Sequence, residues 1–163
     1  MLNVQFGFTE FPDHPRLNER SPLSPGYIVV SQHGEDGLEV AARYDMMWLV
    51  MDLPELMSGL QGFVGNSRTK YYSFAATEAG CHIQIDRRKH SMVLLQVNEM
   101  QGLHSESEVF QAFQEGVMRF MKEEYSLVDF KRLEKESPLS TERVLDAEFR
   151  QCYWDFTASR HPA

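Results

Sequence analysis

Cysteine is scarce in this chain: Cys81 and Cys152 are the only two among 163 residues. They can form at most one bridge, and neither belongs to a Cys-x-x-Cys or a Cys/His spacing of the kind that binds zinc. We therefore expect two reduced, buried thiols, which is the usual state of cysteine in the cytoplasm.

The sequence also lacks a long hydrophobic run. The longest one, Met46 to Met51, falls far short of the roughly 20 apolar residues that a membrane span needs. The N-terminal stretch reaches an acidic residue at Glu10 without the basic segment and apolar core of a secretory signal. These features predict a cytoplasmic protein.

Positive charge is in short supply, because 16 Lys and Arg face 24 Asp and Glu for a formal charge of -8. That balance argues against a protein that follows nucleic-acid phosphates or sits on anionic lipid. Hydrophobic residues make up 42% of the chain and aromatic residues 12%, which is enough to close a core and argues against disorder. The length predicts a single domain over residues 1–163.

Signature motifs are absent as well. The chain has no GxGxxG, GxxxxGKS, HExxH or GxSxG, the patterns of dinucleotide sites, phosphate loops, zinc peptidases and serine hydrolases. The sequence therefore gives no reason to assign a catalytic residue, a cofactor or a metal ligand, and we expect none of the three.

What is present begins with strands. Leu2, Val4, Phe6 and Phe8 alternate with polar residues and glycine, which predicts a strand with one buried face. Four of the seven prolines follow within residues 11–26, and this composition predicts an irregular surface loop. A hairpin is predicted next from residues 27–44, and three antiparallel strands from 70–75, 81–87 and 91–97.

Helices are predicted from capping boxes and from apolar stripes. Asp52 with Glu55 predicts a helix that ends near Gly62 and Gly65, and Ser105 with Glu108 predicts a second one. A short helix over 127–136 and a last one from Thr141 complete a helical part at about 105–158. The resulting fold class is α+β, an antiparallel sheet of about five to six strands with helices packed on one face.

The negative charge is concentrated in the helical half, since residues 99–148 hold 12 acidic and 6 basic side chains, a net of -6. This excess either provides general solubility or forms a surface that attracts a basic protein. The candidate partner-binding acids are Glu106, Glu108, Glu115 and Glu123. Trp154 lies off the apolar stripe of the last helix, so it is either an exposed anchor or packs against the proline-rich loop or the sheet edge.

Other polar residues favour ordinary interpretations. His82 and His90 would need a carboxylate from elsewhere to bind a metal, so surface histidines are the simpler expectation. Cys81 and His82 are adjacent in a strand and point to opposite faces, which prevents direct proton exchange. The basic residues 87–89 lie at a hairpin turn, where charges commonly keep an edge soluble.

One resemblance gives a direction. The stretch from Trp48 to Leu53 leading into a helix, Tyr72-Ser73-Phe74, Ile83-Gln84-Ile85, the strand from Val93 to Val97 and the capped helix together form the pattern. It resembles small immunity proteins of bacterial polymorphic-toxin and contact-dependent growth inhibition systems. The match covers about residues 44–125 in element order and apolar placement, whereas the proline-rich segment and the tail after Tyr125 depart from it.

This resemblance implies a non-catalytic cytoplasmic protein that binds and neutralises a toxin domain, and it transfers no binding residues. An acidic inhibitor suits a basic toxin such as a nuclease. Two alternatives stay open. One is a small-molecule-binding or enzymatic domain with a pocket between sheet and helices, where His82 or His90 acts. The other is a regulatory subunit that self-associates through an aromatic patch.

Overall fold

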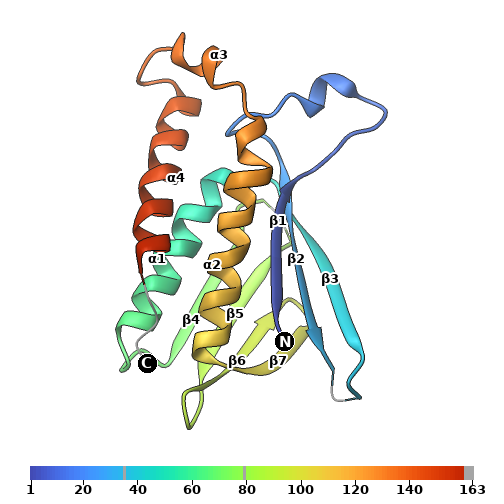
Figure 1. Ribbon diagram of the computed structural model, residues 1–163, viewed down its shortest axis with the longest axis vertical. Helices are drawn as coiled ribbons and strands as arrows, with labels where there is room; N and C mark the ends of the chain where they lie inside the picture. Colours follow the sequence, from blue (N-terminus) through green and yellow to red (C-terminus); the bar gives the residue numbers. More distant parts are fainter. Residues whose placement is uncertain (35, 79, 160–163) are drawn as a thin grey trace.

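Two antiparallel sheets and a layer of helices make up the computed structural model, which describes residues 1–34, 36–78 and 80–159 (Figure 1). The first sheet has the order β1-β2-β3, with bounds Asn3–Phe8, Gly26–His33 and Glu39–Met46. The second has the order β4-β5-β6-β7, with bounds Tyr71–Ala75, His82–Arg87, Met92–Val97 and Met100–Ser105.

The helices are α1 (Leu49–Gly65), α2 (Glu106–Glu123), α3 (Phe130–Glu134) and α4 (Thr141–Ala158). Two short 3-10 turns, η1 (Pro15–Asn18) and η2 (Tyr125–Leu127), lie in the connections. The predicted α+β class is confirmed. None of the helices in the described ranges is both long enough and apolar enough to cross a lipid bilayer.

The prediction of a single sheet with five to six strands was wrong, because the described residues form seven strands in two sheets. Helix α1 lies between β3 and β4, and these two strands do not pair. The additional strand, β7, follows a tight turn in which Asn98 has φ of 51° and Val97 pairs with Met100. Asparagine tolerates this left-handed conformation better than most residues, which lets the hairpin close.

The helices form two layers rather than one. Helix α2 packs on β1 and touches β6 and β7, whereas α4 packs mainly on α1 and lies outermost (Figure 1). Gly116 allows α2 to approach β1, since a Cβ there would lie 2.6 Å from the carbonyl oxygen of Val4. The predicted helices on one face are therefore present, with α4 as a second layer over α1.

One continuous core joins both sheets to the helices. Its aromatic part runs from Phe8, 5.2 Å from Phe120 between ring centroids, to Phe149, 4.8 Å from Tyr125. These rings pack edge-on or tilted, the arrangements that aromatic quadrupoles favour. The core therefore ties β1 to α2 and α4 across the whole helical half.

Helix starts agree with the sequence in two cases and differ in two. The Ser105 hydroxyl accepts from the backbone N–H of Glu108 at 3.1 Å, as the second capping box predicts, and Ser140 caps α4. Helix α1 instead starts at Leu49, so Asp52 lies in its first turn and is not its cap. Helix α3 begins at Phe130 with Asp129 as its cap, three residues later than the predicted start at 127.

Candidate functional site

The first of the predicted partner-binding acids, Glu106, is engaged inside the molecule. Its carboxylate lies 2.7 Å from Nη2 of Arg87, and each side chain is only 13% exposed. A charge pair this close and this sheltered connects β5 to the start of α2. Glu106 therefore belongs to the internal contacts of the fold and does not extend an open acidic surface, contrary to the sequence-based expectation.

The other three acids on α2 are more accessible. Glu108 contacts Nδ1 of His104 at 2.8 Å, and Glu115 accepts a hydrogen bond from Gln111 at 2.9 Å. Glu115 and Glu123 are exposed, whereas Glu108 is half-buried. The structure thus leaves Glu115 and Glu123 as the fully accessible members of the predicted set.

Trp154 is open to solvent, with 66% of its surface exposed. Its ring contacts that of its neighbour Tyr153, at 5.5 Å between centroids in an edge-on arrangement. The alternative in which Trp154 packs against the proline-rich loop or a sheet edge is therefore not observed. An exposed indole is a large apolar area left in water, and such groups are enriched at interface centres.

Around Trp154, α4 presents a continuous outward stripe that we call the α4 outer face. The stripe recurs at helical spacing and comprises Val144, Ala147, Glu148, Gln151, Trp154 and Asp155, all exposed. Its two charges are both negative. The side-chain amide of Gln151 donates to the Asp155 carboxylate at 3.3 Å and holds it on this face.

The basic residues of α4 contact α3 and the segment that follows it. Arg150 lies 4.7 Å over the ring of Phe130 and bonds Asp146 at 3.0 Å through Nε. Arg143 donates to the backbone carbonyl of Glu136 at 3.0 Å. Both cations thus contact α3 or the segment after it, while Arg150, one helical turn before Trp154 and with 41% of its side chain exposed, places one positive charge beside the α4 outer face.

A second feature is a groove of about 830 Å³ between the proline-rich loop and the η2–α3 segment. The loop side is ordered by its own hydrogen bonds, because the Asn18 side chain both accepts from and donates to the backbone of Phe11. The N–H of Ser21 donates to the Ser24 hydroxyl at 2.9 Å, and the N–H of Ser24 donates to the Ser21 carbonyl at 3.0 Å. The predicted irregular loop therefore forms an ordered side of this groove.

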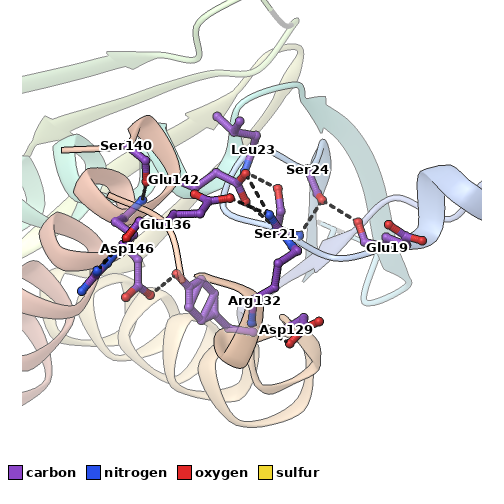
Figure 2. A network of polar contacts seen from close by, with 12 residues as sticks. Glu19, Ser21, Leu23, Ser24, Asp129, Arg132, Glu136, Ser140, Glu142 and Asp146 are labelled. Carbon is purple, nitrogen blue, oxygen red and sulfur yellow. Dashed lines mark hydrogen bonds and ion pairs between the residues drawn. The ribbon is translucent and has the colours of Figure 1, made fainter. Parts of the chain in front are cut away.

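The charges of this groove are largely neutralised within the fold. Figure 2 shows Arg132 beside Glu136 and Glu142, to which it donates at 2.8 Å and 2.7 Å. Arg20, whose side chain is 9% exposed, donates to the carbonyl of Thr9 at 2.8 Å. Asp129 and Glu19 also line the groove. The mixed lining indicates no single class of ligand.

The space between the second sheet and the helices is nearly filled. The cavity found there measures about 10 Å³ and is lined chiefly by apolar residues of α1, β5, β6 and α2: Leu60, Phe63, Val64, Ile85, Val93, Val109 and Phe110. A volume of this size is at or below what one water molecule needs. The pocket that the enzymatic alternative requires is therefore not present at this place.

The histidines and cysteines show little chemistry in the described residues. Nε2 of His82 lies 2.9 Å from the Ser73 hydroxyl, yet a nucleophile of this type also needs a third group that orients the imidazole, and no described residue supplies one. His90 lies exposed in the β5–β6 turn. No cluster of three His, Cys, Asp or Glu side chains suited to a metal occurs in the described ranges.

Cys81 is buried and Cys152 half-buried, and both are free thiols. Burial, together with the nearby charge of Asp52, raises the pKa of the Cys81 thiol to about 12. It is therefore protonated and unreactive at neutral pH. Cys81 faces the core while His82 faces outward, as strand alternation predicts.

Arg87 is the residue whose role the sequence interpretation missed. Its guanidinium donates to the carbonyls of Phe63 at 2.8 Å and Asn66 at 2.9 Å, and it stacks 4.1 Å over the Phe63 ring. Only Arg88 and Lys89 of the basic run are exposed. The available signal was the alternation of β5, because Arg87 shares its parity with the inward residues Ile83 and Ile85.

Comparison of the chain with protein-family models, with curated proteins and with solved structures finds no match. The fold and the surface themselves define the class: an α+β protein with two antiparallel sheets whose outermost helix exposes a tryptophan among acidic side chains.

Proposed function

We propose that this is a non-catalytic, immunity-type protein of the cytoplasm that binds a basic toxin domain through the α4 outer face. The observation that supports this proposal is Trp154, 66% exposed on the outermost helix between Glu148 and Asp155. A large aromatic side chain that is mostly in water contributes little to the core, whereas at an interface such a side chain supplies much of the binding free energy.

The acidic neighbours would act on association more than on final affinity. Exposed carboxylates steer a basic partner toward the face and raise the association rate, an effect that salt weakens. The excess of -8 in the whole chain extends this attraction beyond contact distance. A nuclease is the favoured toxin class, since the basic surface that meets phosphates is then the surface that the inhibitor covers.

The test is co-expression with a toxin-like reading frame, should the genome carry one beside this gene. Wild-type protein is expected to restore growth, and Trp154→Ala is expected to weaken binding at least tenfold in a titration with the purified toxin domain. Tyr71→Ala is the matched control, because Tyr71 is also an exposed aromatic residue, at 48%, but lies on β4. Circular dichroism of both variants should match the wild type.

Two outcomes would contradict the proposal. Toxicity that is unchanged by the wild-type protein would remove the immunity role. Equal protection by Trp154→Ala and wild type would remove the α4 outer face as the binding site. A double reversal, Glu148→Lys with Asp155→Lys, is expected to lower the association rate and to flatten its dependence on salt.

A further inference from the structure

Strand β3 leaves one long edge of the first sheet open. It pairs with β2 on one side and is the terminal strand of the order β1-β2-β3. In Figure 1 it forms the margin of the molecule, on the opposite side from α4. Any surface on β3 is therefore separate from the α4 outer face.

The hydrogen-bonding pattern shows which backbone groups point out of this edge. The N–H of Gly34 donates to the carbonyl of Leu38 at 2.7 Å, and His33 pairs with Glu39 in the next position. Bonds alternate along an antiparallel pair, so the even-numbered residues of β3 bond to β2. The outward N–H and C=O groups belong to Glu39, Ala41, Arg43 and Asp45, and the described residues supply no partner for them.

Two of the other edges are covered at the corresponding positions. On β1, the N–H of Phe8 donates to the Glu124 carboxylate, and α2 packs against the carbonyl of Val4. On β7, the carbonyl of Gln101 accepts from the side-chain amide of Gln32 at 2.8 Å. Such contacts are how folded proteins protect sheet edges from unwanted pairing.

The edge of β4 is open but short. The bond from Ala76 N–H to the Cys81 carbonyl fixes its alternation, which leaves only the uncharged residues Tyr71, Ser73 and Ala75 pointing outward. Strand β3 offers four outward residues over its eight, and three of these four are charged. It is therefore the longer and chemically more selective template.

Apolar side chains on the inner face of β3 continue beyond the buried core and stay partly exposed. Val40 is 46% exposed and Tyr44 is half-buried, although both belong to the same face as the fully buried Met46. An added strand would lie beside these side chains and shield them with its own inward residues. Burial of apolar area then adds to the backbone hydrogen bonds of the new ladder.

Charge excludes a second copy of this chain as the natural occupant. Two β3 strands paired antiparallel overlap most fully when centred on Ala42 or on Arg43. The first register sets Glu39 opposite Asp45 twice, and the second sets Arg43 opposite itself. Directly opposed like charges destabilise a pair of strands. Arg43 is moreover held 3.9 Å over the Tyr27 ring.

We propose that the open edge of β3 receives an extended strand of a basic partner by antiparallel strand addition. Lysine or arginine of that strand faces Glu39 and Asp45, and apolar residues face Val40 and Tyr44. The backbone ladder supplies most of the affinity, while the two acidic positions select the partner. This second interaction surface does not depend on the α4 outer face.

A heptapeptide tests the inference with the full chain. The probe is the fluorescently labelled peptide Lys-Val-Thr-Val-Thr-Val-Lys, and the comparison peptide has glutamate at both ends. Fluorescence polarisation is expected to show at least tenfold tighter binding of the lysine peptide, with a loss of affinity in high salt. Amide chemical shifts should move along β3 and remain unchanged along α4.

Matched proline variants locate the binding edge. Ala41→Pro removes an outward N–H and leaves the bonds to β2 in place, so it should abolish binding without unfolding the protein. Ser73→Pro makes the same change on β4 and should bind like the wild type. Glu39→Lys with Asp45→Lys should reverse the preference between the two peptides.

Four results would overturn the inference. They are absence of binding by the lysine peptide, equal binding of both peptides, loss of binding in Ser73→Pro but not in Ala41→Pro, and a concentration-dependent dimer that Ala41→Pro abolishes. The last would identify a second copy as the occupant. Because Trp154→Ala should leave peptide binding unchanged, failure here is distinguishable from failure of the proposed function.

Discussion

Asp52 is a carboxylate held almost entirely out of water, with 2% of the residue exposed. Both of its oxygens accept hydrogen bonds from Thr77, one from the backbone N–H and one from the hydroxyl, each at 2.9 Å. Burial raises the pKa of this carboxyl, the two bonds from Thr77 oppose the rise, and the charge of Glu55 adds to it. Desolvation therefore raises the pKa of Asp52 by more than the two hydrogen bonds from Thr77 lower it.

The raised pKa of Asp52 in the folded state determines whether the free energy of unfolding rises or falls with pH. The folded protein binds a proton at Asp52 more tightly than the unfolded chain does, so the free energy of unfolding falls as pH rises from the ordinary aspartate range through the folded pKa. We expect Asp52→Asn, which keeps an acceptor for Thr77, to be at least as stable as wild type at pH 7. Urea unfolding at a series of pH values should show the advantage of Asp52→Asn growing with pH.

The control is Asp52→Leu, which removes the acceptor of both hydrogen bonds from Thr77, an exposed residue. Each lost hydrogen bond contributes about 0.5–1.5 kcal/mol, so this variant should be less stable than wild type. A stability advantage of the wild type over Asp52→Asn that increases toward alkaline pH would contradict the assignment.

At this scale the sequence predicted single residues well when their partners were local. Ser105 caps the helix that follows it, as its capping box predicts, and lies three residues from the amide it bonds. Asp52 fits the same local pattern, but its partner is Thr77, 25 residues further along, and that contact exists only after α1 has packed beside β4. The spacing of residues along the sequence could not show which of these side chains caps a helix and which bonds a distant residue.

At the scale of elements, Arg87 joins β5 to the end of α1 and to the start of α2. It bonds the Phe63 carbonyl at 2.8 Å and Glu106 at 2.7 Å. We expect Arg87→Leu to lower the free energy of unfolding by about 3–5 kcal/mol, because it removes the guanidinium from a sheltered ion pair. Thermal and urea unfolding measure the loss.

The double variant Arg87→Leu with Glu106→Leu separates the charge from the rest of the contact. Removing both charges should recover part of the stability that Arg87→Leu loses, since the sheltered carboxylate is removed together with the guanidinium. Arg88→Leu serves as the control, because Arg88 is exposed in the same turn and should have little effect. Equal losses for Arg87→Leu and Arg88→Leu would refute the structural role of Arg87.

His104 links the two sheets through its ring. Its Nε2 lies 2.7 Å from Oε1 of Gln32 on β2, and its Nδ1 lies 2.8 Å from Glu108 on α2. The Gln32 amide donates to the Gln101 carbonyl, which fixes Oε1 toward the histidine. Both ring nitrogens are therefore engaged, one with a side chain of β2 and one with a side chain of α2.

A double-mutant cycle of Gln32→Ala and His104→Ala measures this link. We expect a coupling free energy of about 0.5–3 kcal/mol, as for groups in one hydrogen-bond network. Gln32→Ala with the exposed Ser73→Ala should be additive and serves as the reference cycle. Additive losses for Gln32 and His104 would show that the contact does not hold the sheets together.

Most elements were predicted close to their observed bounds because a strong periodic pattern marks them. Helix α2 has a regular apolar stripe and a capping serine, and strands β4, β5 and β6 show clear alternation. Strand β7 was missed. Its residues alternate weakly and include a glycine, Gly102, whose lack of a side chain lets Gln32 reach His104.

For the whole molecule, the sequence indicated the α+β class but could not divide the strands between two sheets. That division depends on which strands pair across α1 and on how α2 spans both groups, and these are tertiary contacts. The same contacts leave β3 and β4 as open edges, so neither edge could be assigned from the sequence. The acidic excess of the helical half was visible, but the internal pairing of Glu106 was not.

Because one core joins both sheets, the molecule should unfold as a unit. Its buried cluster includes Phe6 and Ile28 of the first sheet, Ile83 and Val93 of the second, and Phe113 of α2 between them. Exposing either sheet alone would leave the apolar face of α2 in water, which makes partial unfolding costly.

The Trp154→Phe variant leaves Trp48 as the single tryptophan, so its fluorescence reports on the start of α1. In urea, this fluorescence and the far-ultraviolet circular dichroism should give one transition with the same midpoint. Two separated midpoints would instead show that the sheets are independently stable units.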